Sequence, residues 1–133
     1  MGKSEEALKT DDVDLIKRCR SSMATQITSD LALIDKQLVK KVGDSYDIAS
    51  INDQVIQSKK KHLSDHFDMI LKLHERFTEL RPEGVTEAEE ESLTQSDVDY
   101  IGKIETKVYD AKEKINQYEG IFSQIQDFIF DWV

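Results

Sequence analysis

The stretch that decides the fold runs from residue 101 to residue 132, IGKIETKVYDAKEKINQYEGIFSQIQDFIFDW. Apolar and aromatic residues recur along it in alternating steps of three and four, and lysine and glutamate occupy many of the positions between them. The repeating positions are Ile101, Ile104, Val108, Ala111, Ile115, Tyr118, Phe122, Ile125, Ile129 and Trp132. This pattern is typical of a heptad seam in a coiled-coil helix, because an amphipathic helix of a globular bundle carries a wider apolar stripe.

A second seam with the same alternation precedes it and is less regular. It consists of Ala49, Asn52, Ile56, Lys59, Leu63, His66, Ile70, Leu73, Phe77 and Leu80. Asn52, Lys59 and His66 fall at core positions, where a polar residue costs stability and specifies register or partner. We expect these three residues to face a different chain with complementary groups, or the water-exposed edge of a bundle.

Residues 20–31, RSSMATQITSDL, are rich in serine and threonine, which are not strong helix formers. An apolar stripe of helical spacing nevertheless runs through this segment and beyond, through Met23, Ile27, Leu31, Ile34, Leu38 and Val42. The small side chains Ser22, Ala24 and Thr25 lie beside it. We interpret the segment as a helical packing face for a partner subunit.

Two places interrupt the apolar pattern. Near Gly43 the steps become three, four and four, a stutter that predicts either a bend with a change of partner or a tolerated surface glycine. At 80–85, Pro82 ends the first helix and Gly84 gives a flexible exit. The next helix then begins at Thr86, which opens a capping box, or at Ser96, with the acidic stretch between them as loop or frayed helix.

The pattern therefore predicts an all-α, elongated helical coiled coil. We expect one long helix at about 12–80 and a shorter second helix at about 97–132, joined by an acidic loop. The corresponding divisions are a disordered N-terminus at 1–10, a coiled-coil helix at 11–80, a linker at 81–96 and a second coiled-coil helix at 97–133. A first helix on the order of 100 Å long would be too long for the second to cover, so we expect an apolar seam that needs other chains.

Composition excludes several classes of function. The net charge of −9 makes the chain a poor candidate for nucleic-acid binding, which needs clustered lysine and arginine. No apolar run is long enough to span a bilayer, and the chain opens without a secretory leader. The single cysteine, Cys19, cannot form an internal disulfide and is interpreted as a small packed residue. We expect a cytoplasmic protein without direct membrane insertion.

The search for catalytic chemistry yields one weak candidate. His62 and His66 are one helical turn apart, a spacing that allows two imidazoles to share a metal, and Asp65 lies beside them. The neighbouring lysines at 59–61 repel a cation, so a solvated His62 and an interface His66 are the preferred interpretation. No phosphate-binding loop or nucleophile–base set is present. We therefore expect no enzymatic activity, no cofactor, no metal site and no small-molecule substrate.

The C-terminal residues 127–133, DFIFDWV, gather aromatic side chains. Ile129 and Trp132 continue the seam, whereas Phe128 and Phe130 point sideways. An exposed patch of this kind predicts a partner-binding hot spot.

The segment Cys19–Leu31 resembles the second-subunit family of biogenesis of lysosome-related organelles complex one (BLOC-one), which is shared with BORC. That family carries Cys-Arg, a Ser-x-Met-Ala-Thr core, and a Thr and a Leu at the offsets of Thr28 and Leu31. Tyr46 with Asn52, and 77–82, FTELRP, are similar to later family positions. The acidic stretch 87–97 and the aromatic C-terminus depart from the family pattern.

The resemblance implies a non-enzymatic scaffold. Family members assemble with other small coiled-coil subunits into hetero-oligomeric rods that act in endosomal sorting, lysosome-related organelle biogenesis and lysosome positioning. It also implies peripheral association with endosome and lysosome membranes through the complex. We expect the partner interface to comprise the seam residues, which are Met23, Ala24, Ile27, Leu31, Ile34, Leu38, Asn52, Ile56, Leu63, His66, Ile70, Leu73, Phe77, Leu80, Ile101, Ile104, Val108, Ile115, Tyr118, Phe122, Ile125, Ile129 and Trp132.

Two alternatives stay open at this point. The chain could be a self-associating coiled-coil tether or adaptor, of a kinetochore-type or SNARE-regulating kind. It could also be a metal-dependent helical-bundle enzyme that uses His62, His66 and Asp65.

Overall fold

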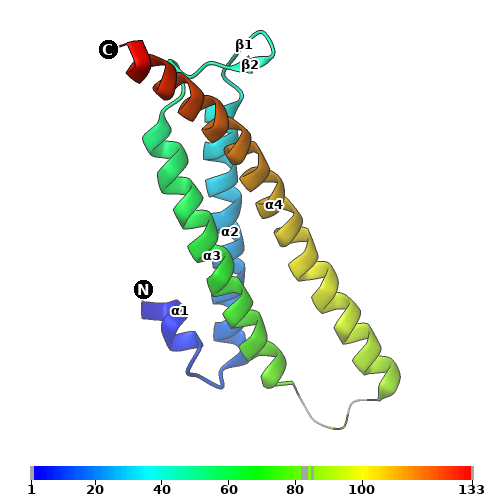
Figure 1. Cartoon of the computed structure of the whole chain (residues 1–133). Coiled ribbons are helices and arrows are strands. Elements are labelled where there is room, and N and C mark those ends of the chain that lie inside the picture. The colour runs from blue at the N-terminus through cyan, green and yellow to red at the C-terminus, as the bar shows by residue number, and fades with distance from the viewer. Residues whose placement is uncertain (1, 82–83, 85, 133) are drawn as a thin grey trace.

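The computed structural model describes residues 2–81, 84 and 86–132, and the side chains of residues 5–81, 84 and 86–125. The chain folds as helices, which confirms the predicted helical class, with one small β-hairpin added (Figure 1). The elements are α1 (Gly2–Ala7), α2 (Val13–Leu38), β1 (Lys41–Val42), β2 (Ser45–Tyr46), α3 (Asp53–Glu79) and α4 (Glu87–Trp132).

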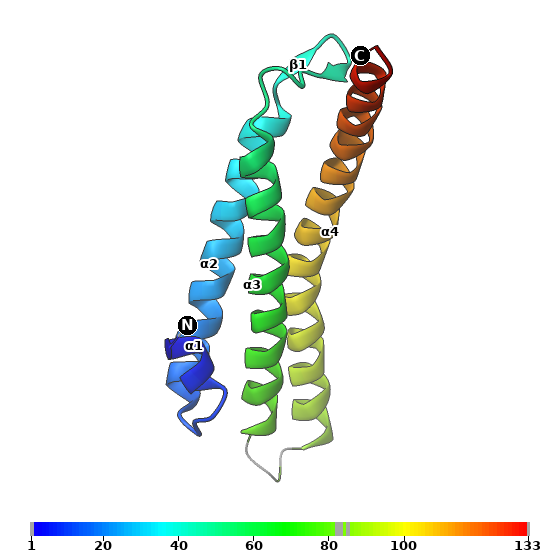
Figure 2. The same cartoon turned by 60° about the vertical axis from the view of Figure 1, so that its left-hand side comes forward.

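Three long helices form an up-down-up arrangement. The hairpin connects α2 to α3 at one end, and the chain passes from α3 to α4 at the other (Figures 1 and 2). The contact between α2 and α3 is much more extensive than the contact of either helix with α4. The molecule is therefore a close helical pair with a third helix along its side.

The prediction of one continuous helix over 12–80 is wrong. α2 ends at Leu38 and α3 begins at Asp53. Between them, Lys41 pairs with Tyr46 and Val42 with Ser45 in an antiparallel hairpin closed by Gly43 and Asp44. Gly43 has φ +65°, a conformation that glycine adopts without penalty, and a two-residue Gly-Asp loop is a hairpin signal. The glycine therefore reverses the chain instead of bending a helix.

Asn52 also has a different role from the predicted one. It is the N-cap of α3 and not a seam residue. Its side-chain oxygen accepts hydrogen bonds from the backbone N–H groups of Gln54 (3.1 Å) and Val55 (3.3 Å). An asparagine in this position satisfies the unpaired donors of the first helical turn.

The N-terminal segment is helical at Gly2–Ala7, within the stretch 1–10 that the sequence predicted to be disordered. α1 places Ala7 in a fully buried position against Ile16, Cys19 and Leu73. Arg76 of α3 donates to the backbone carbonyl of Thr10 at 3.2 Å, which ties the α1–α2 connection to the pair.

α4 begins ten residues before the predicted start at 97, because Thr86 is its cap. The Thr86 hydroxyl accepts a hydrogen bond from the backbone N–H of Glu89 at 3.2 Å. This agrees with the first of the two predicted starts, and the acidic stretch after it is helical. The linker predicted at 81–96 is correspondingly shorter. The predicted break at Pro82 lies outside the described residues.

The core lies between α2 and α3, and α4 adds Val108, Ala111, Ile115 and Tyr118 to it. Ile16, Ile34, Ile56, Leu63 and Ile70 are fully buried within the single chain. The expectation that the chain cannot cover its own seam is therefore wrong for these helices. The hairpin folds α2 (26 residues) onto α3 (27 residues), and helices of nearly equal length cover one another's apolar faces.

Candidate functional site

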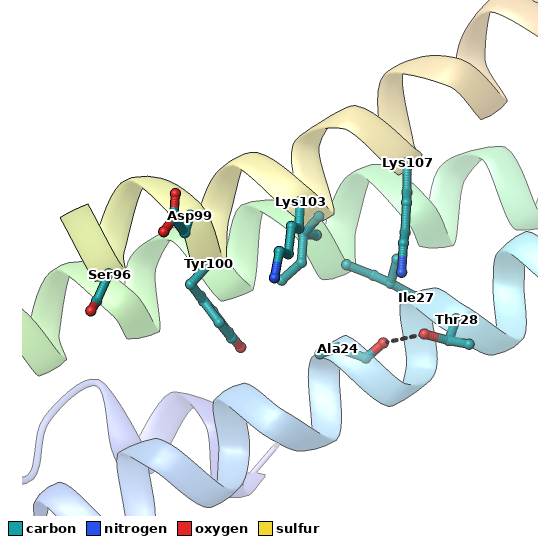
Figure 3. A pocket seen from close by; sticks show the side chains of 9 residues that line it. Ala24, Ile27, Thr28, Ser96, Asp99, Tyr100, Lys103 and Lys107 are labelled. Carbon is teal, nitrogen blue, oxygen red and sulfur yellow. Dashed lines mark hydrogen bonds between the residues drawn. The ribbon is translucent and has the colours of Figure 1, made fainter.

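A groove between α2 and α4 combines apolar and charged residues. Ala24, Ile27 and Thr28 line it from α2, and Tyr100 and Ile104 are among the residues from α4. Figure 3 shows Tyr100, Lys103 and Lys107 extending from α4 toward α2. The cavity volume is about 480 Å³. The groove, called the α2–α4 groove below, is also lined by Ser96, Asp99, Lys103 and Lys107.

The floor and rim of this groove differ in character. Ile27 is 2% exposed and forms part of the apolar floor, against which Ala24 and Ile104 pack. Lys103 and Lys107 are exposed on one face of α4 at the rim. Such a surface can hold an apolar group below and an anionic group above.

The Tyr100 hydroxyl is a buried polar group at this site. Its oxygen has no hydrogen-bond partner among the described residues. Burial raises the pKa of Tyr100, with nearby Arg20 opposing that shift. The hydroxyl is therefore neutral at physiological pH and is able to donate or accept a hydrogen bond.

One end of the groove adjoins a group that we call the arginine cluster: Arg20, His74, Phe77, Arg81, Asp97 and Tyr100. The Arg20 guanidinium lies between two aromatic rings, 4.5 Å from the Phe77 centroid and 4.4 Å from the Tyr100 centroid. Its Nη1 donates to His74 Nδ1 at 2.8 Å. Because a guanidinium only donates, Nδ1 must be unprotonated, so the bond requires neutral His74.

Asp97 connects α3 to α4 within the same cluster. Its carboxylate accepts two hydrogen bonds from Arg81, at 2.7 Å and 2.5 Å, a bidentate geometry. This pairing lowers the pKa of Asp97. His74 Nε2 lies 3.0 Å from Asp97 Oδ1. Because His74 is neutral when it accepts from Arg20, this is a contact between a neutral imidazole and a carboxylate, not an ion pair. Burial lowers the pKa of His74, which Asp97 opposes and Arg20 reinforces.

A second polar contact holds α4 near the hairpin. The Tyr118 hydroxyl donates to Asp53 Oδ1 at 2.6 Å, and its ring meets Tyr46 edge-on at 6.2 Å between centroids. Burial raises the pKa of Tyr118, and Asp53 adds to the shift. Lys60 donates to Glu119 Oε1 at 2.8 Å nearby. α4 is thus held at two places along its length, at the arginine cluster and at Tyr118, and the groove lies along α4 in this region.

Two of the predicted polar seam positions meet a complementary group from the chain itself. Asp30 of α2 is 3% exposed. Its Oδ2 lies 2.8 Å from His66 Nδ1, and its Oδ1 lies 3.7 Å from Lys59 Nζ. The expectation that these residues face solvent or another chain is corrected here, because Asp30 supplies the partner within the α2–α3 pair.

The structure places the predicted interface residues in several different environments. Most are buried inside the single chain: Ile27, Ile34, Leu38, Ile56, Leu63, Ile70, Leu73, Val108, Ile115 and Tyr118. Ala24, Ile27 and Ile104 come together at the groove, and Ile125 is 39% exposed on α4. Met23, Leu31, Phe77, Leu80, Ile101 and Phe122 are partly buried against the core. The side chains of Phe128, Ile129, Phe130 and Trp132 lie outside the described residues.

The candidate metal ligands are not brought together. His66 faces Asp30, and the rings of His62 and His66 lie 5.8 Å apart between centroids. Across the part of the chain that the structure describes, no group of three histidine, cysteine or acidic side chains is arranged to hold a metal ion. None of the described helices is apolar over a length sufficient to cross a bilayer.

Sequence reasoning missed the polar residues of the site, namely Arg20, Asp97, Tyr100, Lys103 and Lys107. A heptad pattern assigns such residues to the solvent side, and only the placement of α4 brings them opposite α2. The one available signal was the pairing of small residues with an apolar stripe at 22–27, from which we predicted a packing face for a partner subunit. Ala24 and Ile27 of that stripe line the groove, whereas Ser22 and Thr25 are exposed. No protein-family model, curated protein or solved structure matches the chain.

Proposed function

We propose that this protein is a non-enzymatic structural subunit that joins other small helical chains through the α2–α4 groove. The observation that carries the proposal is the contrast between a closed α2–α3 pair and an open groove beside it. In many assemblies an amphipathic helix of one chain binds in an apolar groove of another. The apolar residues that anchor it are spaced about one helical turn apart. A groove with an apolar floor and a charged rim suits that use.

The contacts of α4 support this assignment. The arginine cluster and the Tyr118–Asp53 hydrogen bond fix α4 on either side of the groove, so the hollow between them is part of a defined surface. Filling it within the chain would need larger side chains than Ala24 and Thr28. An arrangement of three helices with one open side can accept a further helix to complete a bundle.

The resemblance of residues 19–31 to the BLOC-one second-subunit family supports the cellular part of the proposal. The assembly would act in the cytosol as a peripheral complex on endosome and lysosome membranes, in organelle biogenesis and lysosome positioning. Ala24, Ile27 and Thr28 belong to that resembling segment and line the groove. The segment that carries the resemblance thus coincides with the surface proposed to bind a partner.

A second candidate function is self-association as a tether. Val98 is 60% exposed and Tyr109 is 61% exposed on α4. They are eleven residues apart, which places them on the same side of the helix. A symmetric contact along this face would give a homodimer.

Affinity purification of the tagged full-length chain from its native cells, followed by mass spectrometry and light scattering, tests the proposal. We expect several other small helical proteins in fixed ratio with the chain. Recovery of a homodimer alone would favour the tether. A monomer that recovers no other chain would contradict both functions.

A further inference from the structure

Lys103 and Lys107 are two cations at the rim of the α2–α4 groove in an acidic chain. They lie one helical turn apart on α4, and none of the carboxylates that the structure describes lies within 4 Å of either ammonium. Other exposed lysines, such as Lys61 and Lys72, also lack an ion pair with a described carboxylate, but they do not line this groove. The position of Lys103 and Lys107 beside an apolar floor makes their charge available to an external anion at the groove.

The same two lysines separate two hollows. One is the α2–α4 groove, and the other is a shallower hollow of about 490 Å³ on α4, where Gly102 and Thr106 also lie. A Cβ atom added at Gly102 would meet nothing within 4 Å. The surface around the lysines is therefore open along one and a half turns of α4, and a second backbone can approach it.

We propose that an acidic amphipathic helix of a different chain docks in the α2–α4 groove. Its carboxylates, one turn apart, pair with Lys103 and Lys107, and its apolar residues lie over Ile27 and Ile104. This inference rests on the proposed function and adds the chemistry of the partner. Matching charges one turn apart on two helices give orientation and register as well as attraction.

Two polar residues of the groove, Asp99 and Tyr100, bear on where the carboxylates of the docked helix lie. Asp99 lines the groove and accepts a hydrogen bond from Gln95 at 2.9 Å, so its charge repels an acidic group at that end. The docked carboxylates therefore lie beside Lys103 and Lys107, away from Asp99. The buried Tyr100 hydroxyl is the unpartnered donor on the groove wall.

Charge also favours a different chain over a second copy. A second copy carries the same net charge of −9, and like-charge repulsion works against self-association of two strongly acidic chains. A different chain can present a local pair of carboxylates on a helix without that overall excess.

The test uses the full-length protein and two synthetic amphipathic helices. One peptide carries glutamate pairs at i and i+4 beside leucine, and the other carries lysine at the same positions. Titration by calorimetry and by ¹⁵N NMR is done on the wild type, on Lys103→Glu/Lys107→Glu, and on the control Lys61→Glu/Lys72→Glu. The control makes the same charge change at exposed positions on α3.

We expect the glutamate peptide to bind the wild type and the control equally, and to bind the groove variant about tenfold or more weakly. The lysine peptide should show the reverse preference, and NMR shifts should map to residues 24–28 and 96–107. Equal binding to all three proteins, or no binding to the wild type, would overturn the inference. Circular dichroism of the groove variant verifies that it is folded.

The failure of this inference can be separated from failure of the proposed function. If the native complex assembles equally with Lys103→Glu/Lys107→Glu, the structural role stands and the acidic partner in this groove is wrong. If sedimentation shows that the wild type binds only a second copy through the groove, the different-chain assignment is wrong. If no complex forms but the peptide preferences hold, the groove chemistry stands and the proposed function fails.

Discussion

The α2–α3 and α2–α4 interfaces use the same helix and differ in kind. Against α3, α2 presents the fully buried Ile34 together with the buried Asp30. Against α4, it presents Ala24 and Thr28 across a hollow of about 480 Å³. The first interface is a core with its polar groups paired. The second includes Val108, Ala111, Ile115 and Tyr118 of α4, which are buried in the same core, and leaves a groove open along residues 96–107.

This difference indicates that the two interfaces have different tasks. Close packing of aliphatic side chains contributes most of the stability of a small domain, because each buried side chain removes apolar area from water. Contacts between polar groups contribute less net energy but fix geometry. We infer that the α2–α3 pair and the buried residues of α4 hold the fold together, and that residues 96–107 of α4 are positioned to present a surface.

The largest expected difference is in the loss of folding stability when an isoleucine is truncated in the aliphatic core and in the groove. Ile34→Ala or Ile70→Ala removes a fully buried side chain and should destabilise the chain by about 2–5 kcal/mol. Ile104→Ala, at the partly buried floor of the groove, should cost about 1 kcal/mol or less, because the groove already leaves that side chain partly uncovered. Urea unfolding followed by circular dichroism measures both. Equal losses at the two sites would remove the distinction between the interfaces.

The next effect concerns the arginine cluster. Asp97→Asn removes the negative charge and replaces one of the two oxygens that accept from Arg81 with an NH₂ donor. It should cost about 1–2 kcal/mol, since Asp97 keeps some solvent contact. Asp99→Asn, two residues on, loses only a contact with Gln95 and should change stability by less than about 0.5 kcal/mol. Thermal unfolding of both variants gives the comparison. A larger loss at Asp99 would mean that the cluster does not hold α4.

Stability should also depend on pH through His74. Its pKa is lowered in the folded chain from the ordinary value of 6.5, chiefly by burial, so the unfolded chain takes up a proton at higher pH than the folded chain. Stability is therefore complete above about pH 6.5, falls as the pH decreases through that value, and levels off below the folded pKa. His74→Gln should flatten this decline when unfolding is measured between pH 5 and 8. The exposed His62→Gln is the control, and an identical flattening there would refute the assignment.

The helical seam and the turn at Gly43 show how much of the fold could be predicted from the sequence. Helical spacing correctly predicted helices and most of the buried residues. The reason is that an apolar seam with a period of 3.5 residues is buried against the seam of any helix that packs beside it, in the same chain or in another. It did not reveal that the seam turns back at Gly43, since the stutter there fits a bend as well as a reversal. The Gly-Asp pair was the local signal for the hairpin. The groove could not be predicted, because it depends on how α4 lies against α2.

The smallest expected effect compares two glycines with equally open surroundings. A Cβ atom added at Gly43 or at Gly102 would meet nothing within 4 Å, so alanine clashes at neither site. Gly43→Ala should destabilise by about 1 kcal/mol, because φ of +65° disfavours a side chain. Gly102→Ala should stabilise by about 0.5–1 kcal/mol, because α4 is helical there. Matched thermal melts of the two variants give the signs, and the same sign for both would show that one local geometry is misassigned.

The most direct test of the central claim is hydrogen–deuterium exchange of the full-length chain, alone and in its purified native complex. The α2–α3 pair should be protected in both samples, because its core is complete within the chain. On complex formation, exchange should slow at residues 24–28 and 96–107, which line the α2–α4 groove. Slowing elsewhere on the molecule, with unchanged exchange along the groove, would contradict the account.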